Sequence, residues 1–112
     1  MNKKVAAAVL VRAAGRCERC GSPAQSPALH HRKLRSRGGK DELSNVVALH
    51  HACHNLTTGS VHLSPKKATT EGWLVSSWDD PATTPVLYWT GELVLLNLDG
   101  TSTTLEGVSN GK

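Results

Sequence analysis

The first apolar pattern of the chain has helical spacing. Val9 follows Val5 by four residues, and the pattern continues to Ala14, just before Gly15. Apolar side chains at this spacing line one face of an α-helix, and a glycine commonly ends such a helix. The pattern therefore predicts a short helix over residues 3–14.

Shorter apolar runs with strand character follow. Residues 46–49 are all apolar and partly β-branched, which indicates a buried strand. Residues 28–33 hold few apolar side chains, but their position before a glycine-rich turn allows a short strand. The runs 86–89 and 93–98 flank residues 90–92 in the pattern of a β-hairpin.

Two further helices and a polar end complete the expected elements. A helix begins after the buried strand and covers residues 50–58, and another covers residues 64–72. In the second, Ser64 has the chemistry of an N-cap and Pro65 stands at the first helical position. Residues 100–112 are polar and rich in Gly, Ser and Thr, which favours a short strand followed by a frayed tail.

Composition changes this picture by making the core small. The 112 residues suit one domain, but the chain has no Phe and only 4% aromatic residues, so a structural metal would be a useful staple. Three cysteines cannot all pair with one another, and their spacing suits zinc better than a disulfide framework. A reducing compartment is the expectation.

No apolar run approaches the roughly 20 residues that a membrane helix needs. The segment 3–11 resembles part of a signal peptide, but its apolar stretch is only seven residues long and Arg12 follows at once. We therefore expect a cytoplasmic protein without a membrane segment.

The charge of the chain is divided unevenly. Residues 1–40 carry ten Lys and Arg against the single acid Glu18, a net of +9, whereas residues 41–112 carry three against eight acids, a net of −5. A basic front half is what neutralisation of phosphates requires, although many charge runs are only solvated surface. The balance favours a nucleic-acid partner.

The cysteines form one candidate zinc site. Cys17 and Cys20 are separated by two residues, and His50 and Cys53 have the same separation. Zinc prefers four N or S ligands in a tetrahedron, commonly as two close pairs on separate turns. These four side chains are therefore the predicted ligands of a structural zinc, with the adjacent His51 as the alternative to His50.

The remaining histidines suggest hydrolysis at a second site. His30, His31, His54 and His62 are left once the zinc pair is assigned. Phosphodiester hydrolysis needs a deprotonated water and a cation at the leaving oxygen. Because consecutive strand residues face opposite sides, His30 and His31 would not simply share one metal, so one can bind metal while the other accepts a proton from water.

The order of these motifs resembles a known family. The chain carries a CxxC pair, a His-His pair, a Gly-Gly pair, an asparagine and a Cys-His pair at residues 17–20, 30–31, 38–39, 45 and 53–54. This order resembles the HNH endonuclease family, especially compact members of bacteriophages and actinobacteria. The resemblance covers residues 12–62, and residues 72–98 are similar to the extension of many phage members.

The resemblance implies roles for single residues. His31 is then the general base, and Asn45 forms a hydrogen bond near it that fixes the imidazole. His30 and His54 are then ligands of the catalytic cation.

The third ligand of that cation stays open between two residues. The family usually has His or Asn one helical turn after His54, and this chain has Thr58 there. If the pattern has gained four residues, His62 becomes the ligand, and we favour His62.

The implied fold is an α+β fold. It has a small zinc-stapled ββα-metal (His-Me finger) core, an N-terminal helix and a C-terminal β-hairpin extension. We expect the nuclease domain over residues 1–72, with the extension and polar tail over residues 73–112 packed on the same domain.

The implied activity is that of a metal-dependent DNA endonuclease of low sequence specificity. Mg²⁺ or Mn²⁺ is the expected catalytic cation, with Ni²⁺ and Zn²⁺ as further candidates. The DNA phosphates would be bound by the basic side chains Arg32, Lys33, Arg35, Arg37 and Lys40. Phage DNA processing or packaging is the expected setting, with packaging proteins as further partners and the host cytoplasm as the location.

Two alternatives bear on function. The chain is otherwise a zinc-stabilised DNA-binding module without catalysis, or an accessory subunit of a packaging machine. The tryptophans at 73, 78 and 89 suit either stacking on bases or the core, and we favour the core because aromatic residues in strands are mostly buried.

Overall fold

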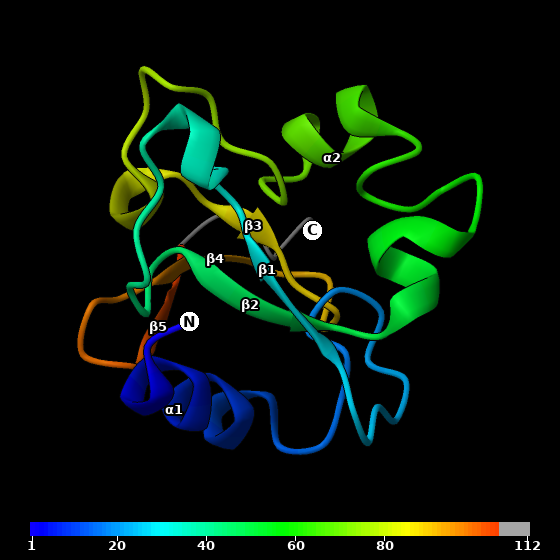
Figure 1. The fold of residues 1–112 in the computed structure, drawn as a ribbon, viewed down its shortest axis with the longest axis horizontal. Helices are drawn as coiled ribbons and strands as arrows, with labels where there is room; N and C mark the ends of the chain where they lie inside the picture. Colours follow the sequence, from blue (N-terminus) through cyan, green and yellow to red (C-terminus); the bar gives the residue numbers. More distant parts are fainter. Residues whose placement is uncertain (106–112) are drawn as a thin grey trace.

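The computed structural model describes residues 1–105, apart from the side chain of Leu56. Its elements follow in the order α1 (Lys3–Ala13), β1 (Ala28–His31), η1 (Arg35–Arg37), β2 (Val46–Leu49), η2 (Ala52–Leu56), α2 (Pro65–Thr70), η3 (Pro81–Thr83), β3 (Val86–Leu87), β4 (Leu93–Leu96) and β5 (Ser102–Thr104). This is the predicted α+β fold, with an N-terminal helix and a C-terminal hairpin (Figure 1). None of the described helices has the length and apolar character to cross a membrane.

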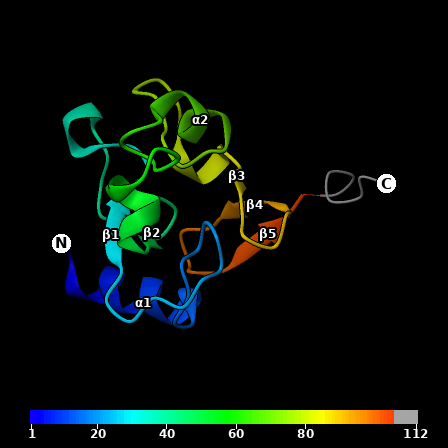
Figure 2. The ribbon, with the colours of Figure 1, turned by 90° about the vertical axis from the view of Figure 1, so that its right-hand side faces the viewer.

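Helix α1 is set by its cap and by one apolar face. The side chain of Asn2 accepts hydrogen bonds from the backbone N–H groups of Lys4 and Val5, which satisfies two free donors of the first turn. Val9 and Ala13 are the buried residues of the helix. Both figures of the ribbon show α1 lying under the β1–β2 pair (Figures 1 and 2).

Strands β1 and β2 form an antiparallel pair between two cores. His30 lies opposite Val47 in the register. Val46 and Ala48 pack in the cluster that contains α1, whereas Val47 and Leu49 join the larger cluster. A strand that is apolar at every position is covered on both faces, so the prediction of a buried strand here is confirmed.

The chain after β2 forms a shorter helix than predicted. Residues 50–58 were expected to be helical, but only the π-helical turn η2 forms. The carbonyl groups of Cys53 and His54 accept hydrogen bonds from the backbone of Val61 and His62, at 2.8 and 3.0 Å. Because the returning chain occupies these acceptors, the helix cannot continue through them.

Helix α2 begins at Pro65 as predicted, but Ser64 does not cap it. The hydroxyl of Ser64 donates to the carbonyl of Thr58 instead. Strand β1 and helix α2 each end two residues before the predicted bounds of 33 and 72.

Strands β3, β4 and β5 form an antiparallel sheet in that order. The predicted hairpin is confirmed, although its strands are shorter than the runs 86–89 and 93–98. A short strand also forms where residues 100–112 were expected to have one, while the tail predicted after it lies outside the described residues. Figure 2 shows this sheet beside the β1–β2 pair.

One core joins the two halves of the chain. Trp73 and Val86 belong to the same buried cluster as Cys17, Val47 and Leu49. The segment after residue 72 therefore packs on the segment before it, and the domain boundary at residue 72 stays a prediction.

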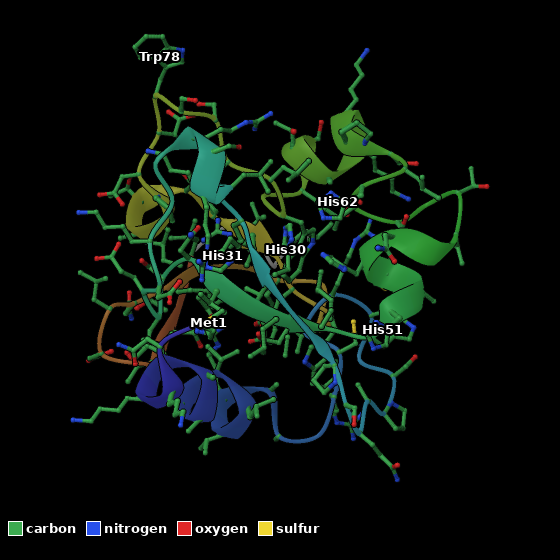
Figure 3. All side chains as sticks on the ribbon, in the orientation of Figure 1. Met1, His30, His31, His51, His62 and Trp78 are labelled. Atoms are coloured by element: carbon green, nitrogen blue, oxygen red, sulfur yellow. The ribbon has the colours of Figure 1, made fainter. Side chains whose placement is uncertain are left out.

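The tryptophans do not share one environment. Trp73 is fully buried, as the core interpretation predicted, but 94% of Trp78 is exposed. Figure 3 shows Trp78 projecting from the tip of the molecule. Trp89 is 41% exposed, and the guanidinium of Arg16 lies 5.2 Å from its ring centroid. The core interpretation is correct for Trp73 and wrong for Trp78.

Candidate active site

A tight turn brings the first two cysteines together. The backbone N–H of Cys17 donates to the carbonyl of Ser22, and that of Gly21 donates to the carbonyl of Cys17, each at 2.8 Å. Gly21 has φ +80°, a conformation that strains other residues, and a Cβ there would also lie 2.9 Å from Trp89. The turn therefore depends on glycine at this position.

The predicted zinc ligands form one cluster. Donor atoms of Cys17, Cys20, His50 and Cys53 all lie within 4.8 Å of one another. His51 does not join them, because its Nε2 lies 3.1 Å from the carbonyl oxygen of Ser26 (Figure 3). The cluster therefore contains His50 and leaves out the alternative, His51.

The donor chemistry of this cluster fits zinc. Burial, together with the neighbouring Cys17 and Cys20, raises the pKa of Cys53 to about 12. Burial also opposes the thiolate of Cys20, but hydrogen bonds with Ser22 outweigh it and lower the pKa of that thiol. Three thiols in one place cannot all ionise without a cation, whereas Zn²⁺ binds three thiolates and one imidazole in a closed tetrahedral site. A Cys₃His zinc staple is therefore consistent with the side chains present.

A buried ion pair between Arg12 and Glu18 stabilises the cysteine turn. Arg12 donates from Nε and Nη2 to the carboxylate of Glu18, at 2.7 and 3.0 Å. The same carboxylate accepts from the backbone N–H of Ala48 and from the hydroxyl of Tyr88, both at 2.8 Å. Burial and the charge of Glu18 raise the pKa of Tyr88. One carboxylate therefore connects α1, the cysteine turn, β2 and the hairpin.

His30 points from β1 into the protein. Its Nε2 lies 2.8 Å from the carbonyl oxygen of Trp73, and a carbonyl only accepts, so Nε2 carries the proton. Nδ1 then keeps a free lone pair. Burial lowers the pKa of His30 to about 3, against the opposing effect of this hydrogen bond, and keeps the ring neutral. A neutral imidazole whose second nitrogen donates to a carbonyl is the usual arrangement of a metal ligand.

Two exposed or half-buried histidines complete a second cluster. His30, His54 and His62 have ring nitrogens within 4.8 Å of one another. The Nε2 atoms of His54 and His62 are 3.0 Å apart. Burial lowers the pKa of His54, and the nearby His62 lowers it further. Three converging imidazoles fit a divalent cation with an open coordination position, so these side chains are suited to holding a catalytic metal.

The structure also separates the two candidates for the third position. His62 lies in the cluster, brought there by its backbone hydrogen bond to His54. The carbonyl of Thr58 accepts the hydroxyl of Ser64. The geometry thus supports the preference for His62.

His31 follows His30 and lies on the opposite face of β1 (Figure 3). Its Nε2 is 2.7 Å from Oδ1 of Asp41, and the guanidinium of Arg35 lies beside both groups. The side chain of His31 is 13% exposed. The candidate base therefore lies outside the three-histidine cluster, with a carboxylate as its partner.

The hydrogen bonds of the Asn45 side chain go to the backbone of the basic turn and not to the imidazole of His31. Its Oδ1 accepts from the backbone N–H of Lys33 at 2.7 Å, and its Nδ2 donates to the carbonyls of Lys33 and Lys40 at 3.0 and 3.1 Å. The buried amide thus ties together the two ends of the basic turn. The turn is close enough that a Cβ on Gly39 would lie 1.7 Å from the Lys33 carbonyl oxygen.

The expected phosphate contact of Arg32 is wrong. Its side chain is fully buried, and its guanidinium donates to the carbonyls of Gly72, Ser44, Pro81 and Thr84, at 2.8, 2.7, 3.1 and 2.6 Å. Burial lowers the pKa of Arg32 to about 9. These four hydrogen bonds hold the backbone together, and the fully buried side chain does not reach the surface where DNA would bind.

The other basic side chains stay at the surface around η1. The side chain of Arg35 is 61% exposed. Lys33 donates to the carbonyl of Asp79 at 3.0 Å, and Arg37 to that of Val75 at 3.3 Å. The four candidates that keep their position for DNA are Lys33, Arg35, Arg37 and Lys40.

Sequence reasoning missed two acids at these sites. Glu18 stands between Cys17 and Cys20 and is buried, and its isolation among ten basic residues was a usable signal of a buried partner. Asp41 follows the basic turn directly, but no spacing rule connects it with His31, ten residues earlier.

A β-pair followed by a helical turn, with a Cys₃His cluster behind it, defines a small zinc-stapled ββα-metal domain. Residues 17–59 match the family model described as HNH endonuclease. This part of the chain is therefore similar to HNH endonuclease domains, and the similarity indicates a nuclease-type function with a metal. Comparison with curated proteins and with solved structures gives no match.

Proposed function

We propose that this chain is a metal-dependent endonuclease that hydrolyses phosphodiester bonds of DNA. The observation that carries the proposal is the division of the His30–His31 pair. His30 belongs to a cluster of three imidazoles, while His31 points the other way and keeps a carboxylate partner. A metal-binding group and a base on adjacent residues are the two functions that hydrolysis of a phosphodiester needs.

Each residue then has a chemical task. His30, His54 and His62 would hold a divalent cation. Mg²⁺ or Mn²⁺ is the expected ion, and imidazole ligands also suit Ni²⁺ or Zn²⁺. The cation would supply positive charge next to the leaving oxygen. His31 would accept a proton from the attacking water, which is the task of a general base. Asn45 holds the turn that follows His31.

The surface around η1 supplies the contact with DNA. Lys33, Arg35, Arg37 and Lys40 would neutralise phosphates, and such contacts carry no base readout. Cleavage of low sequence specificity follows. A role in phage DNA processing or packaging, with packaging proteins as partners in the host cytoplasm, rests on the resemblance to phage members and stays a prediction.

The test is cleavage of supercoiled plasmid by purified protein in Mg²⁺, Mn²⁺, Ni²⁺ or Zn²⁺. Wild type should nick or linearise the plasmid in at least one cation. His31→Ala should lose on the order of 10²–10⁴-fold in rate, the usual contribution of a general base. Zinc content, melting temperature and DNA binding of this variant should stay near wild type.

The matched control is His51→Ala, which removes a surface histidine that bonds the carbonyl of Ser26 in the loop before β1. It should cut like wild type. If wild type cuts in none of the four cations, the enzyme is ruled out and the zinc-stabilised DNA-binding module takes its place. Equal rates for His31→Ala and wild type would remove the base assignment.

A further inference from the structure

The carboxylate of Asp41 lies at the centre of a hydrogen-bonded group next to His31. Its Oδ1 is 2.7 Å from Nε2 of His31 and 3.2 Å from Nη2 of Arg35. Its Oδ2 accepts from the backbone N–H of Asn2 at 2.7 Å. The side chain is 24% exposed, so three donors surround a carboxylate that also reaches solvent.

These contacts decide which nitrogen of His31 carries the proton. Hydrogen bonds from His31 and Asn2 lower the pKa of Asp41 to about 2, so its carboxylate is ionised and only accepts. Nε2 must therefore donate, and in the neutral ring Nδ1 keeps the lone pair. The Nε atom of Arg35 is also near Nε2, at 3.4 Å, but two donors cannot bond each other, so the shorter Asp41 contact sets the tautomer.

We propose that Asp41 is the positioning residue of the general base. Asp41 holds the imidazole of His31 with the proton on Nε2 and the lone pair on Nδ1, and it keeps the Arg35 guanidinium beside the ring. This inference rests on the proposed nuclease function. It gives Asp41 the task that the family pattern led us to expect of Asn45.

Asn45 contributes to this arrangement indirectly, through the backbone of the turn. Its amide bonds the carbonyl of Lys40, the residue before Asp41, and the backbone of Lys33 at the other end of the turn. With the turn closed, Asp41 follows at a fixed place opposite His31. Asn45 therefore fixes the backbone that carries the carboxylate, and the carboxylate fixes the imidazole.

Plasmid cleavage kinetics test the proposal. Asp41→Ala should lower kcat on the order of 10- to 100-fold, as losing a supporting hydrogen bond does, with the KM for DNA near the wild-type value. Asp41→Asn keeps an oxygen acceptor at the same place and should recover most of the lost kcat. Glu42→Ala removes the neighbouring acid, whose side chain forms no hydrogen bond within the described residues 1–105, and should cut like wild type.

A second control separates catalysis from docking of α1. Asp41 also binds the backbone of Asn2, so its loss could act through the helix. Asn2→Ala removes the side chain that caps α1 but leaves the Asp41–His31 contact in place. It should lower the melting temperature and leave kcat unchanged. If Asn2→Ala lowers kcat as much as Asp41→Ala does, the positioning role is refuted.

The tautomer can be measured without any cleavage. In ¹⁵N spectra of the zinc-loaded full chain at about pH 8, His31 should show a protonated Nε2 and an unprotonated Nδ1. Asp41→Ala should give mixed tautomers. A protonated Nδ1 in wild type overturns the inference even if the protein cuts DNA, and a wild type that never cuts refutes the proposed function while this measurement still decides the hydrogen bond.

Discussion

The two histidine-containing clusters differ in their donors and in their access to solvent. The first has three thiols and one imidazole, and its Cys17 is fully buried in the main core. The second has three imidazoles and ends at the exposed His62. Four protein donors close a tetrahedral site, whereas three leave a position for water or a phosphate oxygen. We call the cysteine cluster the closed site, which suits a structural metal. We call the three-histidine cluster the open site, whose free position suits catalysis.

The two clusters nevertheless share the η2 turn. Cys53 and His54 are consecutive residues of η2, and they face different clusters. The backbone carbonyls of both accept from the segment that ends with His62. The cysteine cluster thus fixes the turn that delivers two of the three imidazoles, so the closed site should control the open one more strongly than the reverse.

The largest expected effect comes from opening the closed site. Cys17→Ser removes a buried thiolate ligand, and structural zinc contributes on the order of 10 kcal/mol to folding of small zinc domains. The variant should lose its zinc and unfold, and the open site should be lost with it. Metal analysis and thermal melting measure both effects.

His51→Ala is the control for this prediction, because it removes a histidine next to the cluster without removing a ligand. It should keep its zinc and melt like wild type. A folded Cys17→Ser protein with wild-type melting would show that the protein core needs no staple.

The sequence predicted the residues of the closed site better than the supports of the open one. Paired separations of two residues point to one tetrahedral ion, and residues 46–49 form a strand because four apolar residues in a row need cover on both faces. Asp41 and the Trp73 carbonyl were not predictable in this way. Asp41 meets His31, and the Trp73 carbonyl meets His30, through tertiary packing. No helical or strand periodicity relates residue 30 to residue 73.

The arginines show the same limit of prediction from the sequence. Arg32 and Arg37 belong to one basic segment, yet one is fully buried and the other exposed. Charge counting treats them alike. What distinguishes them is four backbone carbonyls from the later part of the fold, which converge only where Arg32 lies.

The second largest effect tests that distinction. Arg32→Met keeps much of the side-chain length but leaves four carbonyls without their donor, and each such loss costs at least about 1 kcal/mol. The free energy of unfolding should therefore fall by roughly 4 kcal/mol, as measured by urea titration.

Arg37→Met is the matched control. Its stability should change by less than about 0.5 kcal/mol, while the salt dependence of DNA binding should lose about one unit of slope. Normal stability of Arg32→Met, together with weakened DNA binding, would restore Arg32 as a phosphate contact.

The smallest of the three effects lies at the open site. His62→Ala removes the exposed member of the imidazole cluster. Cleavage should fall by about 100-fold, near the upper end of what a lost partner of a metal site costs, or about 2.7 kcal/mol of activation free energy. Zinc content and melting should stay as in wild type, because the closed site is untouched.

Thr58→Ala is the companion variant and should cut normally, since the structure gives the His62 imidazole the place beside His54. The opposite pattern, with cleavage lost in Thr58→Ala and kept in His62→Ala, would transfer the third ligand to Thr58 and make the imidazole pair a feature of the metal-free protein.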